Sequence, residues 1–282
     1  MYTEIVELYQ FFGVERPECG KGKLTCLHIP TSDKVSPCRR KPAILIIPGG
    51  GYCHVSPRES EPVALQFLAR GYAAFILDYA IAPAVFPVAL REAAMAMRYI
   101  RENADRYEID PGMVAATGFS AGGHLCGTLG TMYDAPEVED IGPAQLLRPD
   151  ALGLCYPVAV EWGITHEGTF ENISGGDHVL RQRLSLDRLV RSDMPPVFLW
   201  HTRSDESVPC RNSLILAQAL DAAGVDFAMH IYRSGPHGLS TADNLSYCDG
   251  AVPEVSWDVP GWIRAEIQFF LEKGLKIRDF EV

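Results

Sequence analysis

The chain has 282 residues and an ordinary globular composition, with 47% hydrophobic and 22% charged side chains, and this hydrophobic share excludes a disordered chain. Its 25 basic and 36 acidic residues give a net charge of −11, which argues against nucleic acid or an anionic membrane as a partner. The 25 glycines and 20 prolines follow no period, which excludes a collagen-like sequence.

The N-terminal residues and the cysteines indicate the compartment. Glu4 and Glu7 stand where a secretory signal peptide needs a positive start and an apolar core, and no apolar run is long enough to span a bilayer. The eight cysteines form no C-x-x-C pair, and no two histidines have the spacing of a metal pair on one helix. We therefore expect a cytoplasmic protein with reduced thiols, no metal and no cofactor, and we leave a homo-oligomer open.

Short apolar runs alternate with helical patterns along the whole chain. No repeat or low-complexity tract divides it, so we predict one domain over residues 1–282, with residues 1–23 as an N-terminal extension. The predicted strands, in chain order, are Leu24–Ile29, Ala43–Ile47, Ala73–Tyr79, Val114–Gly118, Ala151–Tyr156, Val197–Thr202 and Phe227–Tyr232. The predicted helices are Glu59–Arg70, an amphipathic helix through Leu90 and Ala104, a helix capped by Asn212 that ends at Ala223, and a C-terminal helix through Ile263 and Phe270.

The composition of these strands predicts the architecture. Strands that are apolar nearly throughout are buried on both faces, and the helices between them supply crossover connections. The fold class is therefore α/β, with a mostly parallel central sheet and helices on both faces. In such sheets the reactive groups gather on the loops at the carboxyl ends of the strands. Residues 157–194, between two strands, are where a short lid or an acyl pocket would lie.

The candidate nucleophile is Ser120. It follows the strand Val114–Gly118 in the sequence Gly118-Phe119-Ser120-Ala121-Gly122-Gly123, which matches G-x-S-x-G. A strand-to-helix turn this tight needs small residues because a Cβ would clash, and the following helix start offers free N–H groups to an anion. The alternative is a packing turn with a capping serine.

A serine hydroxyl needs a base, and His237 in Gly235-Pro236-His237-Gly238 directly follows the last predicted strand. The acid that would orient it is Asp205, after the strand Val197–Thr202, with Glu206 as the neighbour that could replace it. An ordinary loop histidine is the alternative for His237. The chain order Ser120, Asp205, His237 is typical of α/β-hydrolases rather than of chymotrypsin- or subtilisin-type proteases.

A glycine run, Gly49-Gly50-Gly51, follows the strand Ala43–Ile47. Backbone N–H groups there could approach a substrate oxyanion together with the N–H of Ala121. A flexible turn is the simpler interpretation, and a phosphate-binding loop is disfavoured because no G-K-[ST] follows.

Seven segments resemble the acetyl xylan esterase-like group of α/β-hydrolase esterases and lipases, over roughly residues 24–274. They are PGGGY (48–52), SPRESEPVALQFLARGY (56–72), LDYAIAP (77–83), FPVALREAAMAMRYIREN (86–103), GFSAGGHL (118–125), HTRSDESVP (201–209) and GPHGLS (235–240). The resemblance implies the triad Ser120, Asp205 and His237, and it implies Gly50, Gly51 and Ala121 as the oxyanion donors. Pro48 departs from the H-G-G-G pattern, in which a histidine braces the oxyanion loop.

These residues and the resemblance together predict a serine carboxylesterase that removes short acyl groups from a small-molecule ester, with acetylated xylo-oligosaccharides or other sugars as the expected substrates. The aromatic side chains Tyr52, Trp162 and Trp257 could stack on a sugar or bound an acyl group, although aromatic residues more often lie in the core. An arylformamidase or a small peptidase of the same fold is the alternative function. A non-catalytic binding module on a hydrolase scaffold is disfavoured, because no member of the triad is missing.

Overall fold

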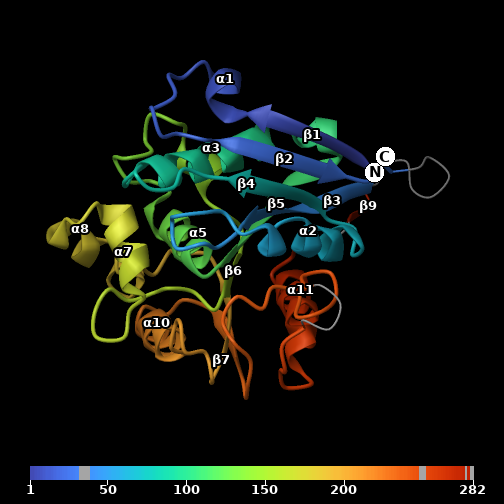
Figure 1. Ribbon diagram of the computed structural model, residues 1–282. Helices are drawn as coiled ribbons and strands as arrows, with labels where there is room; N and C mark the ends of the chain where they lie inside the picture. Colours follow the sequence, from blue (N-terminus) through green and yellow to red (C-terminus); the bar gives the residue numbers. More distant parts are fainter. Residues whose placement is uncertain (32–38, 248–251, 277, 280–282) are drawn as a thin grey trace.

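The computed structural model describes residues 1–31, 39–247, 252–276 and 278–279. A sheet in the order β1-β2-β4-β3-β5-β6-β7-β8 runs through the centre of the protein, and β9 pairs with the start of β3 (Figure 1). The strands are β1 (Tyr2–Glu7), β2 (Lys23–His28), β3 (Arg39–Ile47), β4 (Ala73–Asp78), β5 (Ile109–Phe119), β6 (Leu152–Cys155), β7 (Val197–Thr202), β8 (Phe227–Tyr232) and β9 (Arg278–Asp279).

The helices connect these strands. They are α1 (Leu8–Phe12), α2 (Glu61–Leu68), α3 (Val88–Glu102), α4 (Ala104–Tyr107), α5 (Ala121–Met132), α6 (Ala144–Leu147), α7 (Glu167–Ser174), α8 (His178–Arg183), α9 (Leu186–Leu189), α10 (Arg211–Ala222) and α11 (Trp262–Glu272). Two short 3₁₀ helices, η1 (Pro57–Glu59) and η2 (Val259–Gly261), precede α2 and α11. None of the helices in the described ranges is long and apolar enough to cross a membrane.

The predicted fold class is confirmed. All neighbouring strands from β4 to β8 pair in parallel, while β1 and β2 add an antiparallel edge. The sheet is therefore mixed but mostly parallel. Because the six parallel strands end at the same edge, the loops that follow β3, β5, β6, β7 and β8 converge there.

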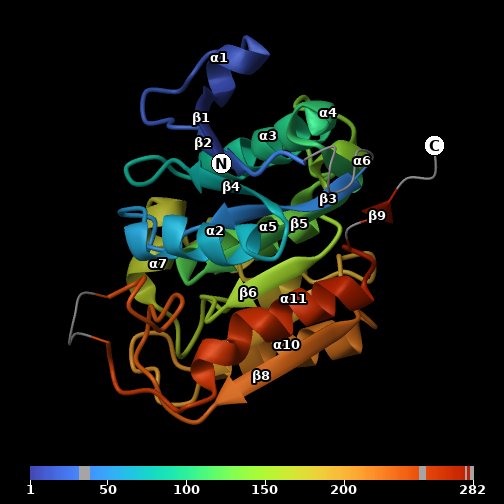
Figure 2. The same cartoon turned by 90° about the vertical axis from the view of Figure 1, so that its right-hand side faces the viewer.

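Alternating side chains of the central strands build two core layers. Ile44 and Ile46 of β3 belong to the layer under α2 and α11, and Leu45 and Ile47 belong to the layer under α3, α5 and α10. All four side chains are fully buried. Figure 2 shows α2 and α11 on the same face of the sheet. The near-continuous apolar runs of the sequence thus correspond to strands covered on both faces.

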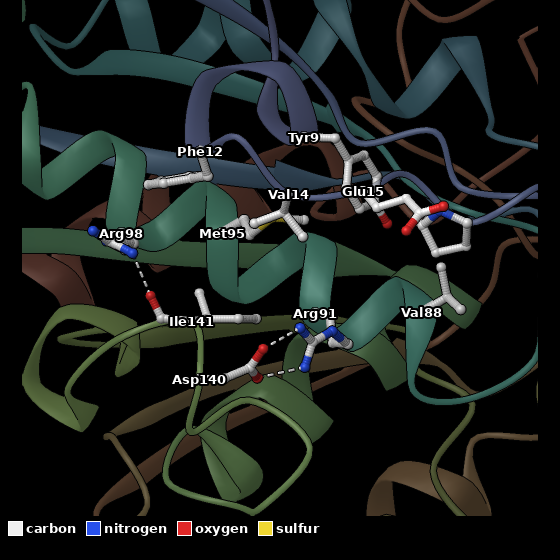
Figure 3. Close-up of a pocket in the computed structure, with 11 residues that line it drawn as sticks. Tyr9, Phe12, Val14, Glu15, Val88, Arg91, Met95, Arg98, Asp140 and Ile141 are labelled. Carbon is white, nitrogen blue, oxygen red and sulfur yellow. Dashed lines mark hydrogen bonds and ion pairs between the residues drawn. The ribbon is translucent and has the colours of Figure 1, made fainter.

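Residues 1–23 contain ordered elements that the sequence analysis did not predict. β1 pairs antiparallel with β2, with Tyr2 opposite His28, and forms one edge of the sheet. After α1, Gly13 turns the chain with φ 65°, a left-handed conformation that costs glycine little. A cavity of about 220 Å³ lies between this segment and α3 (Figure 3). Its described lining residues include none of the predicted site residues, and its charged groups Arg91 and Asp140 are already bonded to each other.

The prediction that Asn212 caps a helix is wrong. The helix α10 begins at Arg211 after Cys210, and Asn212 is completely buried within its first turn. The Asn212 side-chain oxygen accepts hydrogen bonds from the backbone amides of Ala159 and Val160. The asparagine therefore fixes the chain that leaves β6, a long-range contact that local capping rules do not reveal.

The segment 157–194 holds three short helices, α7, α8 and α9, and no strand in the described structure. Asp177 caps α8 by accepting from the amides of Val179 and Leu180. The amide of Leu186 donates to the carbonyl of Ala159, which ties α9 to the start of the segment. Loops and short helices of this kind beside a sheet edge can shape a binding site without altering the sheet.

Candidate active site

Ser120 lies in a tight turn between β5 and α5. Its backbone has φ 54° and ψ −118°, a strained conformation for a residue with a side chain. A Cβ on Gly118 would lie 2.2 Å from the carbonyl oxygen of Gly122, and a Cβ on Gly122 would lie 2.1 Å from the carbonyl oxygen of Ile47. Both glycines are therefore required by close backbone approach, as the G-x-S-x-G pattern predicted.

The helix that follows Ser120 is unusual in its burial. All twelve residues of α5 are buried, and four of them are glycines at positions 122, 123, 127 and 130. A Cβ on Gly127 would lie 2.7 Å from Leu186, and one on Gly130 would lie 2.4 Å from Leu152. The glycines thus let α5 pack against the sheet and against α9 at close distance, which holds Ser120 at the sheet edge.

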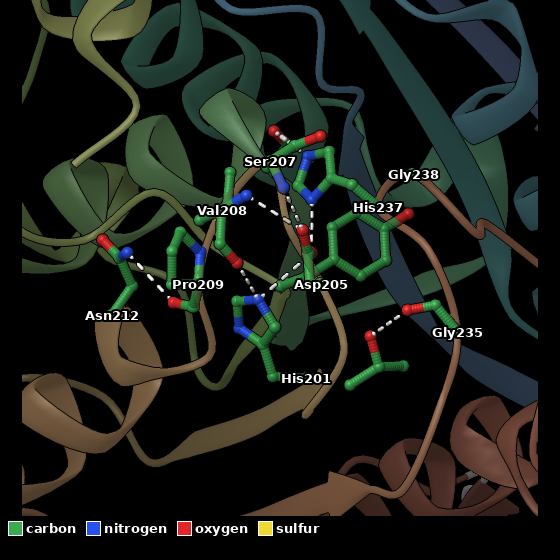
Figure 4. Close-up of polar contacts among 12 residues, drawn as sticks. His201, Asp205, Ser207, Val208, Pro209, Asn212, Gly235, His237 and Gly238 are labelled. Carbon is green, nitrogen blue, oxygen red and sulfur yellow. Dashed lines mark hydrogen bonds and ion pairs between the residues drawn. The ribbon is translucent and has the colours of Figure 1, made fainter. Parts of the chain in front are cut away.

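The structure brings Ser120, His237 and Asp205 together. Figure 4 shows the ring of His237 beside the carboxylate of Asp205. The Nε2 atom of His237 lies 2.7 Å from Ser120 Oγ, and its Nδ1 atom lies 2.6 Å from Asp205 Oδ2. Because a carboxylate can only accept, Nδ1 carries the hydrogen and Nε2 presents a lone pair to the serine hydroxyl. This is the arrangement in which a histidine can take a proton from serine.

Asp205 is 5% exposed and is held on every side by donors. Its Oδ1 atom accepts from the backbone amides of Ser207 and Val208, at 3.0 and 2.9 Å. Burial raises the pKa of Asp205, but the hydrogen bonds from His201, His237 and Val208 outweigh it and hold the pKa well below its usual value. The carboxylate of Asp205 is therefore ionised at every pH at which His237 can act as a base. The neighbouring Glu206 is exposed and takes no part in these contacts within the described chain.

His201 is a contact that the sequence analysis missed. It is fully buried in β7, and its Nε2 atom lies 3.3 Å from Asp205 Oδ2. The same Nε2 atom is 2.8 Å from the carbonyl oxygen of Val208, so it carries a hydrogen. Figure 4 shows His201 on the side of Asp205 away from His237. The only feature of the sequence that could have indicated this contact is that His201 lies four residues before Asp205.

The glycine loop after β3 lies beside the nucleophile. The amide of Gly49 donates to Glu59 Oε2 at 2.8 Å, and a Cβ on Gly49 would lie 3.0 Å from the Cβ of Ser120. Gly50 and Gly51 have φ values of 124° and 62°. Within the described residues, the amides of Gly50, Gly51 and Ala121 donate to no protein acceptor. Free backbone N–H groups in a loop that approaches the nucleophile at Gly49 are suited to bind a developing oxyanion.

Three further side chains lie beside the glycine loop or beside His237 and were not predicted. The side-chain amide of Asn172 donates to the carbonyl of Gly51 at 2.8 Å, and His166 lies within 3.7 Å of where a Gly51 Cβ would stand. Burial and the nearby His237 lower the pKa of His166. The ring of Tyr156 meets the ring of His237 edge to face, with centroids 5.1 Å apart. Tyr156 is the last residue of the predicted strand Ala151–Tyr156, and in the structure it directly follows β6.

The three aromatic residues that were predicted as substrate contacts differ in their burial. Tyr52 is only 1% exposed, and its hydroxyl bonds to Nδ1 of His124 at 2.9 Å. Its prediction as a sugar-stacking residue is corrected, because the core covers its ring. Trp162 is 45% exposed with its indole N–H on Asp187, and Trp257 is 92% exposed. Neither tryptophan shares an aromatic contact or hydrogen bond with Ser120 or His237 in the described part of the chain.

Among the described residues, no group of three or more histidine, cysteine or acidic side chains is arranged to hold a metal ion. His124 is fully buried, burial lowers its pKa to about 4, and its second ring nitrogen lies 2.8 Å from the carbonyl of Leu184. The contacts of Ser120 with His237 and of His237 with Asp205 are suited to nucleophilic attack by serine with a histidine base.

The fold and these contacts are those of the α/β-hydrolase class. Residues 92–248 match the prolyl oligopeptidase family, and residues 29–145 match the BD-FAE family. A crystal structure of an acetyl ester-xyloside bifunctional hydrolase from Caldicellulosiruptor lactoaceticus is similar, with 36% identity, a TM-score of 0.79 and coverage of 90% of this chain and 89% of that one. A carboxylesterase from Lactobacillus plantarum is similar at 26% identity and a TM-score of 0.82, with 98% and 99% of the two chains covered.

Curated relatives agree with this class. The chain is 28% identical to an acetylxylan esterase of Xylanibacter ruminicola, covering 90% of this chain and 50% of that protein. It is 35% identical to endo-1,4-beta-xylanase B of Butyrivibrio fibrisolvens, covering 73% of this chain and 33% of that protein. The chain thus spans about a third to a half of the length of these relatives. It belongs to the prolyl oligopeptidase family, whose model matches more than half of the chain, and to the α/β-hydrolase esterases that the motif resemblance predicted.

Proposed function

We propose that the chain is a serine carboxylesterase that removes short acyl groups, acetyl above all, from neutral sugar esters such as acetylated xylo-oligosaccharides. The observation that supports it most directly is the continuous chain of contacts from Ser120 Oγ through His237 to Asp205, at 2.7 and 2.6 Å. The acetyl preference draws on the acetylxylan esterase and the acetyl ester-xyloside hydrolase among its relatives.

In this mechanism Ser120 Oγ attacks the ester carbonyl carbon while His237 Nε2 takes the hydroxyl proton. The carbonyl oxygen becomes an oxyanion, which the amides of Gly50, Gly51 and Ala121 bind. Asp205 holds the imidazole in the tautomer that accepts this proton and stabilises the imidazolium. The tetrahedral intermediate then breaks the C–O bond, His237 protonates the departing alcohol, and an acyl-serine remains. Water, deprotonated by His237, releases the acid by the same path.

The segment 157–194 is proposed to form the lid or wall of the acyl site. Only about forty residues separate β6 from β7, and part of them form ordinary crossover structure. Asn172 and His166 in this segment already reach the glycine loop, which supports a small enclosed space rather than a long tunnel. The net charge of −11 also favours neutral over anionic substrates.

A panel of p-nitrophenyl esters tests the proposal together with acetate release from acetylated xylose and xylo-oligosaccharides. Each methylene is worth about 1–3 kcal/mol in a closely fitting site, so kcat/KM should fall steeply from acetyl to octanoyl esters. A preference for octanoyl would reject the small acyl site. Aryl formamides and peptide anilides complete the panel, because the prolyl oligopeptidase match makes a small peptidase the competing function. Faster turnover of either than of any ester would replace the proposal.

A further inference from the structure

A buried carboxylate lies directly beneath the glycine loop. Glu59, at the end of η1, is only 3% exposed. Its Oε2 atom accepts the amide hydrogen of Gly49 at 2.8 Å, and its Oε1 atom accepts the phenol hydrogen of Tyr156 at 2.7 Å. The two oxygens of one side chain therefore bind the loop after β3 and the end of β6, elements that are far apart in the sequence.

The loop that carries His237 is joined to the same carboxylate. The phenol oxygen of Tyr156 accepts the backbone amide of Ser240 at 2.9 Å, three residues after His237. The Ser240 hydroxyl donates in turn to the carbonyl of Arg58, the residue before Glu59. Because the ring of Tyr156 also contacts the His237 ring edge to face, movement of this tyrosine would move the base. Glu59 is thus within two hydrogen bonds of both the glycine loop and the histidine loop.

The sequence of the glycine loop explains why such a support is needed. Pro48 occupies the position at which the H-G-G-G pattern places a bracing histidine, and a proline side chain cannot donate. Only the carbonyl of Pro48 is used, as the acceptor for the hydroxyl of Tyr79. By holding the Gly49 amide, Glu59 fixes the peptide that precedes Gly50 and Gly51, and this sets the direction of the two amides that remain free.

We propose that Glu59 is a positioning residue that fixes the oxyanion amides and the His237 loop relative to each other. It does so in place of the histidine that the H-G-G-G pattern has at the position of Pro48. This inference rests on the proposed use of Ser120 as the nucleophile. A misplacement of about 1 Å at a reacting group can cost roughly 100-fold in rate, so the loss of either hydrogen bond should be visible in catalysis. A purely structural role would lower stability and leave the rate per folded molecule unchanged.

The test compares Glu59→Gln, Tyr156→Phe and the control Glu61→Gln. The glutamine keeps the volume of Glu59, but its NH₂ group cannot accept a hydrogen. Either one of the two donor contacts is lost, or the Tyr156 hydroxyl must turn to become the acceptor. Tyr156→Phe leaves the Gly49 bond intact and frees the Ser240 amide. Glu61 is the exposed first residue of α2, so the same charge is removed two positions away from the network.

We expect Glu59→Gln to lower kcat for p-nitrophenyl acetate by roughly 10- to 100-fold while KM changes by less than about threefold. Its affinity for a short alkylboronic acid, which forms a tetrahedral adduct on serine, should fall in parallel. Tyr156→Phe should lower kcat by roughly 3- to 30-fold, and Glu61→Gln should match the wild type. Circular dichroism and a urea melt establish the folded fraction of each variant, and Tyr156→Phe carries the test if Glu59→Gln does not fold.

A fluorophosphonate labelling rate at Ser120 separates this inference from the proposed substrate. If the wild type is labelled but does not turn over esters, the esterase proposal fails, and Glu59 is judged by whether Glu59→Gln slows labelling. Equal labelling and equal kcat in folded Glu59→Gln and wild type would overturn the positioning role. A wild type that is not labelled at Ser120 would overturn the positioning role as well, because Ser120 would then not be the nucleophile that Glu59 is proposed to support.

Discussion

Glu266 gives the sharpest stability prediction of this structure. It lies on α11, is 0% exposed, and pairs with no cation among the described residues. A Cβ on Gly153 of β6 would lie 1.9 Å from Glu266 Oε1, so the carboxyl group is pressed against the sheet. Burial raises the pKa of Glu266 from an ordinary value of 4.5 to about 8, with the Thr117 hydroxyl opposing it.

The direction in which pH changes the stability follows from the protonation of Glu266 in the folded and the unfolded chain. Below pH 4.5 the carboxyl is protonated in both the folded and the unfolded chain, so the full stability is present. Between pH 4.5 and about 8 the unfolded chain ionises while the folded chain stays protonated, and stability is lost as the pH rises. Each unit of pKa difference is worth about 1.4 kcal/mol, so the loss between pH 5 and pH 8 is roughly 3 kcal/mol.

Urea unfolding of wild type and Glu266→Gln at several pH values between 5 and 8 measures this loss. The fluorescence of the buried Trp200 and Trp262 reports unfolding. We expect the variant to gain roughly 3 kcal/mol relative to wild type as the pH rises, whatever its stability at pH 5. Glu272→Gln, at the exposed end of the same helix, is the control and should follow the wild type. Parallel curves for wild type and Glu266→Gln would show that the buried carboxyl does not titrate as described.

The remaining predictions concern the catalytic residues and the turn that holds them. Ser120→Ala and His237→Ala should each lower kcat/KM by roughly 10⁴-fold without loss of fold, and a tenth of the activity retained in either would contradict the mechanism. Asp205→Asn should cost roughly 10²- to 10⁴-fold and Glu206→Gln less than about threefold, and the reverse order in steady-state assays would assign the orienting role to Glu206. Gly122→Ala places a methyl group 2.1 Å from a carbonyl oxygen, so Tm should fall by more than about 5 °C, and an unchanged melting curve would refute the close approach.

The sequence predicted the parts of the site that local patterns determine. Ser120, Asp205 and His237 each follow an apolar strand at a turn marked by glycine, proline or aspartate, and parallel strands bring such turns to one edge. β1 was missed because an edge strand with one exposed face lacks the apolar run that marks a central strand. Its existence depends on pairing with β2, which no local pattern of residues 1–23 reveals.

Contacts between segments that are far apart in the chain could not be predicted from the sequence either. The hydrogen bond between Glu59 and Tyr156 joins residues 97 positions apart, and no local pattern around either residue indicates the other as its partner. Tyr52 failed as a substrate contact for a related reason. Its aromatic ring was the reason to consider it as a substrate contact, but its hydroxyl bonds to His124 on α5 and its ring is buried in the core.

Because α5 is fully buried and rich in glycine, the position of the nucleophile Ser120 depends on the whole fold. Each glycine inside a helix costs about 1 kcal/mol relative to alanine, so a helix with four of them has little tendency to form alone. The helix exists because the sheet and α9 enclose it, and the strained turn at Ser120 exists because the helix does. A partly unfolded chain should therefore contain no weakly active site, and on heating the loss of hydrolysis should coincide with the loss of the core.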